Sequence, residues 1–326
     1  MPSVAPPGRT YNGAMYFLGV DGGQSGTTAV IGDADGRILG RGEAGPCNHV
    51  EFGSGREKLE AAITASIRAA AGMAKLDWPV AFASACFGMS GGPADKREIL
   101  ASLVQAEKIE VTDDARVALL GAMAGGPGII VNAGTGSIAC GRNAQGREMR
   151  AGGWGYIFGD EGGAFDIMRQ ALRAALRNEE GWGPPTQLGP MLLAVTGAST
   201  VNEVLHLFYN RDHPRDRLAG YAPLVDQIAH QGDDVARDIL RQAAQHLAGL
   251  TGSVRKNLFQ PAETVAVAPI GGVFQSKIVS EWFRILMELE PGAVIGPARH
   301  GPAEGALLGA YSLASLTVTL EPLPGL

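Results

Sequence analysis

Residues 128–137 read GIIVNAGTGS, and residues 152–162 read GGWGYIFGDEG. The first stretch is an apolar, β-branched run that ends in a turn of small residues with two hydroxyl side chains, Thr135 and Ser137. Glycine allows the backbone to approach a ligand closely and to adopt positive φ. Backbone N–H groups in such a turn can form a concave site for an anion such as phosphate. Taken alone, the stretch is equally typical of an ordinary glycine-rich hairpin.

A second copy of this pattern lies near the N-terminus. There the apolar run 15–20 leads into residues 21–28, DGGQSGTT, and apolar residues 29–31 follow. In both copies a further turn is followed by a third strand candidate, at 37–42 and at 147–151. Two strand–turn–strand–turn–strand units, each followed by a helical pattern, indicate a duplicated α/β domain. If the two turns face one another, they predict a nucleoside triphosphate held between them.

The overall composition limits the classes of partner. A chain of 326 residues is long enough for two domains, and 45% hydrophobic with 18% charged residues is typical of a globular protein. The net charge of −6, without a Lys/Arg cluster, argues against nucleic acid and anionic membranes. The three cysteines show no paired spacing, which fits a reducing cytoplasm. No apolar run reaches the roughly 18 residues that a membrane-spanning helix needs.

The order of strands and helices gives the expected domain boundaries. Residues 15–124 read β-β-β-α-β-α-β-α, which predicts a mostly parallel sheet covered by helices. The GGPG run at 125–128 is the clearest hinge signal. We therefore expect a loose tail 1–14, an N-terminal domain 15–122 on which 303–326 packs back, and a larger C-terminal domain 123–302. Helices in the second half are predicted at 163–178, 186–194, 200–208, 216–231, 234–258, 276–289 and 303–313, with one strand at 264–268.

Three aspartates follow strand candidates and carry the chemistry of phosphoryl transfer. Asp21 ends the first strand in a glycine turn, where its carboxylate can hold Mg²⁺ directly or through water. Asp113 and Asp114 stand where a strand meets a helix, at the edge of an α/β sheet that binds ligands. One of them is expected to cap the helix and the other to accept a proton from a substrate hydroxyl. The residues themselves do not decide which does which.

Other short motifs point to a sugar and a nucleoside. Asp160 and Glu161 lie in a glycine-flanked loop near Trp154, and carboxylates beside an aromatic plane are typical of sugar sites. The run Gly271-Gly272-Val273, between a strand and a helix, lets a flat adenine or ribose approach the backbone. Asn48 is uninformative alone, and the histidines show no metal-binding spacing. The chain carries neither the P-loop motif, nor GxGxxG after its first strand, nor HExxH.

These motifs resemble those of a known superfamily. Residues 21–27 resemble the first phosphate motif of the sugar kinase/Hsp70/actin superfamily, 133–137 resemble the second, and 271–273 resemble its adenosine motif. The GGWG and GDEG runs within 152–162 narrow the resemblance to N-acetylglucosamine kinases and the wider BadF/BadG/BcrA/BcrD group of activator ATPases. The resemblance covers about residues 15–313. It implies two ribonuclease-H-like domains with ATP and Mg²⁺ in the cleft between them, and commonly a homodimer.

The resemblance also assigns roles to individual residues. It places the catalytic base at the Asp that precedes Ala115, which is Asp114, and a Mg²⁺ contact at Asp21. It implies sugar contacts at Asn48, Ser90, Gly91, Asp114, Trp154 and Asp160. It implies ATP contacts at Gly22, Gly23, Gln24, Ser25, Thr27, Gly134, Thr135, Gly136, Ser137, Gly271 and Gly272. In one position the chain departs from the animal enzymes, which carry a sugar-contacting Asn where this chain has Ile138, so glucosamine or another hexose derivative stays open as the substrate.

Three functions are compatible with this reading. The first is an ATP-dependent kinase that phosphorylates the 6-hydroxyl of N-acetylglucosamine or glucosamine. The second is an ATPase activator of a 2-hydroxyacyl-CoA dehydratase or benzoyl-CoA reductase, which in the family uses a cysteine-held iron–sulfur cluster. The third is a sugar-binding regulator without catalysis. The unpaired cysteines and the presence of Trp154 and Asp114 favour the kinase, with ATP and a small sugar as partners, no nucleic acid or membrane, and a cytoplasmic location.

Overall fold

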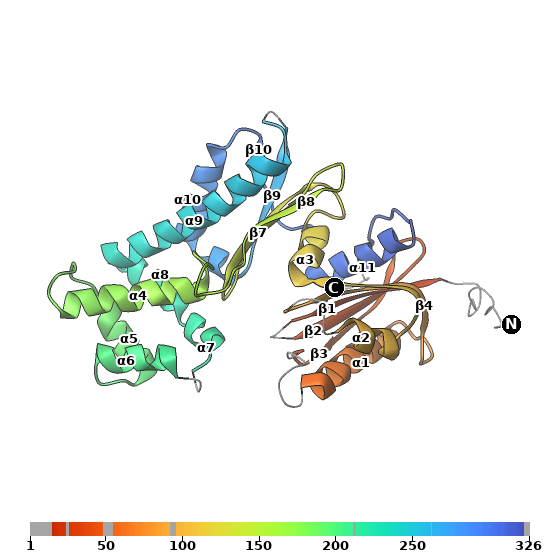
Figure 1. Cartoon of the computed structure of the whole chain (residues 1–326), viewed down its shortest axis with the longest axis horizontal. Helices are drawn as coiled ribbons and strands as arrows, with labels where there is room; N and C mark the ends of the chain where they lie inside the picture. The colour runs from red at the N-terminus through yellow and green to blue at the C-terminus, as the bar shows by residue number, and fades with distance from the viewer. Residues whose placement is uncertain are drawn as a thin grey trace. The chain divides into compact units, whose positions relative to one another are not determined.

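The computed structural model describes residues 15–23, 26–47, 55–91, 96–210, 213–261 and 263–322. The chain divides into two compact units, one formed by residues 1–126 and 298–326 and the other by residues 127–297. Each unit contains a five-stranded mixed sheet with helices packed on it (Figure 1). The α/β class with a duplicated domain, predicted from the repeated turn, is confirmed. Three predicted site residues, Gln24, Ser25 and Asn48, lie outside the described residues.

The sheet of the first unit has the strand order β3-β2-β1-β4-β5. Its strands are β1 (Tyr16–Gly22), β2 (Thr27–Asp33), β3 (Ile38–Ala44), β4 (Ala81–Met89) and β5 (Gln105–Asp113). Short turns join β1 to β2 and β2 to β3, and these pairs are antiparallel; β1–β4 and β4–β5 are parallel. The expectation of a mostly parallel sheet was therefore wrong, because two hairpins make half of the strand pairs antiparallel.

Helices cover both faces of this sheet. Because side chains alternate along a strand, Phe17 of β1 packs into one apolar cluster while Leu18 and Val20 pack into another. Helices α1 (Gly55–Met73) and α2 (Arg97–Leu103) belong to the Leu18 cluster. Helices α3 (Asp114–Ala122) and α11 (Pro302–Leu313) belong to the Phe17 cluster (Figure 1).

Helix α11 comes from the far end of the sequence and packs tightly against α3. A Cβ atom at Gly305 would lie 1.9 Å from the main-chain oxygen of Val117 and 2.4 Å from the main-chain nitrogen of Gly121. No side chain fits at such a distance, so the two helix backbones touch directly. Tyr311 on the same helix contacts the Phe17 ring, with 4.5 Å between ring centroids, and donates its hydroxyl to the Asp33 carbonyl at 2.6 Å.

The sheet of the second unit repeats this arrangement, with the order β10-β9-β6-β7-β8. Its strands are β6 (Gly128–Ala133), β7 (Ser137–Arg142), β8 (Glu148–Gly152), β9 (Val265–Ile270) and β10 (Ala293–Ile295). The pairs β6–β7 and β7–β8 are antiparallel hairpins, and β6–β9 and β9–β10 are parallel. Strand β10 was not predicted, because three residues carry too little periodicity to be recognised.

Helices make up most of the rest of the second unit. They are α4 (Ala164–Glu179), α5 (Leu188–Thr196), α6 (Val201–Tyr209), α7 (Arg215–Ala219), α8 (Ala222–His230), α9 (Asp234–Leu258), η1 (Gly272–Gln275) and α10 (Lys277–Glu288). The single helix predicted at 216–231 is two helices, since Pro223 has no N–H to donate and suits the first turn of a new helix. None of the described helices is by itself long and apolar enough to cross a membrane, although the bent pair α5–α6 passes that test together.

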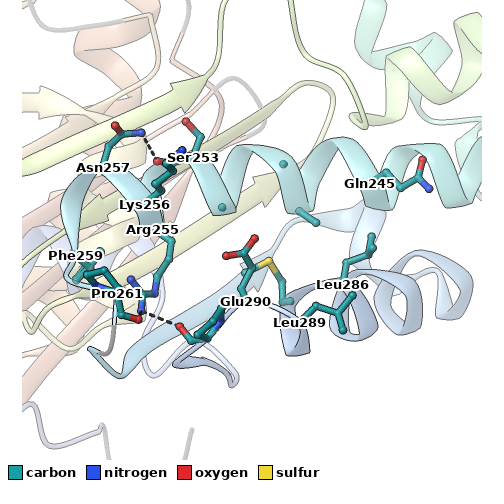
Figure 2. A pocket seen from close by; sticks show the side chains of 15 residues that line it. Gln245, Ser253, Arg255, Lys256, Asn257, Phe259, Pro261, Leu286, Leu289 and Glu290 are labelled. Carbon is teal, nitrogen blue, oxygen red and sulfur yellow. Dashed lines mark hydrogen bonds between the residues drawn. The ribbon is translucent and has the colours of Figure 1, made fainter.

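The guanidinium of Arg255 ties the end of α9 to the loops beside it. Arg255 is buried, and its two terminal nitrogens donate to the carbonyls of Gln260, Pro261, Glu263 and Pro291 at 2.8–3.0 Å. Figure 2 shows this residue at a groove of about 810 Å³ between α9 and α10. The residues predicted to bind ATP and sugar are not among those that line this groove. The groove therefore stays separate from the site described below.

We expect Arg255→Met to destabilise the protein. The substitution keeps the length of the side chain but removes the buried charged group that donates to four carbonyls, which predicts a loss of about 1.5–3 kcal/mol in the free energy of unfolding. Urea denaturation measures this loss. The matched control is Lys256→Met, one residue further along α9 and exposed, with an expected change within about 0.5 kcal/mol. Equal midpoints for the two variants would contradict the role given to Arg255.

Candidate functional site

The first predicted phosphate turn joins β1 to β2. The Gly23 N–H donates to the Gly26 carbonyl at 2.9 Å, and the Cys47 N–H donates to the Gly23 carbonyl at 2.9 Å. Thr27 is buried, and its hydroxyl donates to the Gly45 carbonyl at 2.9 Å. Thr27 therefore fixes the turn to the chain after β3, and its contact with ATP stays a prediction.

Asp21, the last residue but one of β1, carries an unfavourable charge. Burial, together with the nearby carboxylates of Asp114 and Glu304, raises the pKa of Asp21 to about 6, and the guanidinium of Arg41 partly offsets this rise. Arg41 itself forms an ion pair with Glu304, on α11. An added cation beside Asp21 would relieve this repulsion, so the surroundings of Asp21 fit the predicted contact with Mg²⁺.

The carboxyl ends of β1, β4 and β5 meet at one edge of the sheet, because β4 is parallel to both neighbours. The Ser90 N–H, just after β4, donates to the Gly22 carbonyl at 3.0 Å. The Ser90 hydroxyl donates to Oδ2 of Asp114 at 2.7 Å. Gly91 follows with a φ of +76°. Asp21, Ser90 and Asp114 are thereby brought together, as the sequence predicted.

The two neighbouring aspartates have different tasks. Asp113 is the N-cap of α3, since its Oδ1 accepts from the Arg116 N–H at 2.8 Å. Asp114 begins the helix and turns its carboxylate to Ser90 instead. The cap occupies Asp113 and leaves Asp114 beside Asp21 and Ser90.

The second phosphate turn, between β6 and β7, is fastened to the start of α4. The Gly134 N–H donates to the Gly136 carbonyl at 3.0 Å, and the N–H groups of Ala164 and Phe165 donate to the carbonyls of Gly134 and Thr135 at 2.8 and 3.1 Å. Ser137 is buried, and its hydroxyl donates to the Glu161 carbonyl at 2.7 Å. Like Thr27 in the first unit, Ser137 stabilises its turn from within, while Gly134, Thr135 and Gly136 remain half-buried at its surface.

Asp160 lies directly against this turn. A Cβ atom at Gly136 would lie 2.5 Å from Oδ2 of Asp160, so the carboxylate can approach only because residue 136 is glycine. Asp160 adopts a φ of +62°, which is uncommon for a residue with a side chain, and it is nearly buried. Arg215 lies 3.8 Å from its Oδ2. The predicted sugar residue Asp160 and the predicted phosphate turn are therefore neighbours in the second unit.

The loop before Asp160 presents an aromatic surface. Trp154 is 66% exposed, and the guanidinium of Arg150 lies 5.0 Å from the centre of its ring. Behind the loop, Arg169 donates to the Tyr156 carbonyl at 2.8 Å and to Asp166 at 2.7 Å. The sequence analysis did not predict these contacts of Arg169. The i,i+3 spacing of Asp166 and Arg169 at the start of a predicted helix was a signal for their ion pair.

A cavity of about 370 Å³ opens beside the second turn. Gly134 and Gly272 both line it, because β6 and β9 are parallel neighbours; Gly134 directly follows β6, and Gly272 lies two residues after the end of β9. Its walls are mostly small or apolar, among them Ile167, Leu240 and Val273. This volume and lining suit a nucleoside. Gly271, which precedes η1, has a φ of +99°.

The predicted residues thus form two groups, each inside one unit. The first unit contributes Asp21, Gly22, Gly23, Ser90, Gly91 and Asp114, and the second contributes Gly134, Thr135, Gly136, Trp154, Asp160, Gly271 and Gly272. No group of three or more His, Cys, Asp or Glu side chains with metal-binding geometry occurs within the described ranges. A cation at Asp21 would therefore rely on water and phosphate oxygens for its other ligands, as Mg²⁺ usually does.

Comparisons with known proteins agree with this geometry. The model of the BadF/BadG/BcrA/BcrD ATPase family matches residues 18–310. An N-acetylmuramic acid/N-acetylglucosamine kinase from Clostridium acetobutylicum is 32% identical, over 91% of this chain and 98% of the relative. An N-acetyl-D-glucosamine kinase from Dictyostelium discoideum is 30% identical, over 90% of this chain and 96% of the relative. The crystal structure of a putative N-acetylglucosamine kinase from Chromobacterium violaceum is 28% identical, with a TM-score of 0.73 over 90% of this chain and 98% of that one.

Proposed function

Because the chain belongs to the BadF/BadG/BcrA/BcrD ATPase family, we propose that it is an ATP-dependent kinase of an amino sugar. The relatives named above as N-acetylglucosamine kinases span nearly its whole length, which supports an acceptor of this class. We infer that the acceptor is N-acetylglucosamine or glucosamine and that the phosphoryl group goes to its 6-hydroxyl. Ile138, in place of the Asn of the animal enzymes, keeps both sugars in the proposal.

The observation that carries the proposal is the pairing of Asp114 with Ser90. Phosphoryl transfer to an alcohol needs a carboxylate that orients the hydroxyl and accepts its proton. Asp114 has this chemistry, and its carboxylate is held by the Ser90 hydroxyl at 2.7 Å rather than being used as a helix cap. In the proposed reaction Asp114 accepts the proton of the 6-hydroxyl as its oxygen attacks the γ-phosphorus of ATP, and the bond from that phosphorus to the β,γ-bridging oxygen breaks to release ADP.

The phosphate chain of ATP would lie on the two glycine turns. Gly22 and Gly23 in the first unit and Gly134, Thr135 and Gly136 in the second would line the phosphates with backbone that carries little or no side chain, and Gly271 and Gly272 allow the nucleoside to approach the backbone. Gln24 and Ser25 belong to the first turn in this proposal. Asp21 would hold Mg²⁺, directly or through water, and the ion would neutralise the charge of the phosphates when bound. Thr27 and Ser137 keep the turns in shape.

We propose that two polar side chains and one aromatic ring bind the sugar. The Asp160 carboxylate and the Ser90 hydroxyl oxygen would accept hydrogen bonds from sugar hydroxyls, and Trp154 would pack on the apolar face of the sugar. Gly91 and Asn48 complete this set in the family pattern. A homodimer in the cytoplasm, which the family pattern also implies, is part of the proposal and can be checked by light scattering on the purified protein.

The proposal is tested by ADP release from the purified protein with ATP and Mg²⁺. We expect release with N-acetylglucosamine or glucosamine, weaker release with glucose, and little without sugar; ³¹P NMR of the product locates the phosphate. Release that is independent of every sugar would favour an activator ATPase instead. Cys47, Cys86 and Cys140 are all buried, which makes them poor candidates for a cluster at a subunit surface. An absence of ADP release with all sugars would reject the kinase.

A further inference from the structure

The nucleoside-sized cavity contains one acidic side chain that the proposed function leaves without a role. Most of the 370 Å³ cavity has glycine, alanine or aliphatic walls, and Asp226 of α8 is the acidic residue among those that line it. The side chain of Asp226 is 23% exposed. A carboxylate in such surroundings is costly unless donors bind it.

The carboxylate of Asp226 is held in place from two sides. Ser276 donates its hydroxyl to Oδ1 of Asp226, and the same hydroxyl oxygen accepts from the Val279 N–H at 3.2 Å as the N-cap of α10. On the other side, Nε2 of His230 lies 3.4 Å from Oδ2. The hydrogen bond from the Val279 N–H thereby orients the Ser276 side chain, and Ser276 in turn holds the Asp226 carboxylate. Since a carboxylate has about four acceptor positions, acceptor capacity remains for a ligand.

We propose that Asp226 selects the nucleobase of the phosphate donor by accepting a hydrogen bond from the exocyclic amine at position 6 of adenine. The inference rests on the proposed function, in which the cavity takes the nucleoside of ATP next to Gly134 and Gly272. A carboxylate only accepts hydrogen bonds, so it binds an amine and repels a keto oxygen at the same position. Guanine and hypoxanthine carry such an oxygen, and Asp226 disfavours both.

The expected preference for ATP over ITP and GTP follows from the energy of the hydrogen bond between Asp226 and the adenine amine. A hydrogen bond to a charged group, or its loss, typically changes affinity by about 10- to 100-fold. The wild-type protein is therefore expected to use ATP with a kcat/KM at least about tenfold above that for ITP or GTP. The apolar walls bind any purine ring, so they do not by themselves discriminate between these bases.

The experiment compares ATP, GTP and ITP as donors for the wild-type protein and Asp226→Asn. The amide can donate to a keto oxygen as well as accept from an amine, so the ATP-to-ITP ratio of kcat/KM is expected to fall to about threefold or less. The matched control is Asp238→Asn, an exposed aspartate on α9 that pairs with Arg241, with the wild-type ratio retained. Nucleotide affinities from isothermal titration, measured without sugar, give the same ratio independently of turnover.

The outcomes separate the inference from the proposed function. A wild-type protein that binds ITP or GTP as tightly as ATP overturns the inference, whether or not Asp226→Asn folds. An unchanged ATP-to-ITP ratio in folded Asp226→Asn also overturns it, while sugar-dependent ADP release leaves the kinase intact. Selective ATP binding that relaxes in Asp226→Asn, without turnover of any sugar, supports the inference and counts against the kinase.

Discussion

Asp114→Asn is expected to lower kcat by about 10²- to 10⁴-fold while leaving the affinity for ATP nearly unchanged. The amide has nearly the shape of the carboxylate and can still accept the 2.7 Å hydrogen bond from Ser90. It cannot take the proton of the attacking hydroxyl, so only the step that needs this proton transfer is slowed. Steady-state ADP release measures kcat, and isothermal titration measures ATP binding.

The matched control is Asp113→Asn, one residue earlier in the chain. Asparagine caps a helix about as well as aspartate does, so this variant is expected to retain kcat and to change the free energy of unfolding by less than about 0.5 kcal/mol. The two substitutions are chemically identical, yet only one removes the proposed base. A loss of turnover in Asp113→Asn with normal turnover in Asp114→Asn would reverse the assignment.

Asp21→Asn is expected to weaken activity and to stabilise the ligand-free protein. Loss of the charged oxygen should raise the Mg²⁺ concentration needed for half-maximal activity by roughly 10- to 100-fold, as for other groups that act on a metal directly or through water. At the same time, the variant removes a carboxylate that burial and the neighbouring Asp114 and Glu304 make unfavourable. Activity and stability therefore move in opposite directions.

The raised pKa of Asp21 determines how the stability of the wild-type protein changes with pH. The pKa of Asp21 is about 6 in the folded protein, whereas its ordinary value, which applies to the unfolded chain, is 3.8. The folded state therefore binds the proton more tightly than the unfolded state does. Below about pH 4 both states are protonated and the stability is fully present. As the pH rises through 6, up to about 3 kcal/mol of the wild-type free energy of unfolding is lost.

Denaturation in urea without nucleotide or Mg²⁺ measures this effect. We expect Asp21→Asn and the wild type to have similar midpoints at pH 4 and Asn to be the more stable at pH 7.5. Asp35→Asn is the control, because Asp35 is exposed on the turn between β2 and β3 and should show no such difference. A wild type that is the more stable protein at pH 7.5 without ligands would contradict the prediction.

The repeated turn made most of the fold predictable. Residues 21–28 and 133–137 each join two antiparallel strands, and the third strand follows each pair as expected. This local pattern depends on residues that are close in sequence, which is why it can be read from the sequence. The parallel partners are different: β10 has three residues, and its place beside β9 depends on packing between distant segments.

Side-chain tasks at the site were harder to predict. Thr27 and Ser137 have the right chemistry for phosphate, but their hydroxyls are used by carbonyls at Gly45 and Glu161. The pairing of Asp226 with Ser276 joins residues 50 positions apart, and no spacing rule links them. The division of tasks between Asp113 and Asp114 likewise appeared only once the first residue of α3 was fixed.

The packing of α11 on the first unit determines which of the two units can finish folding first during synthesis. The helix supplies Leu307, Ala310 and Tyr311 to the same apolar cluster as Phe17, yet all of residues 127–297 leave the ribosome before it does. Until then α3 is the helix that covers this face of the first sheet, and the rest of the Phe17 cluster is exposed to water. The second unit has all of its strands and helices within a continuous segment, so it can finish folding first, although it is translated later than most of its neighbour.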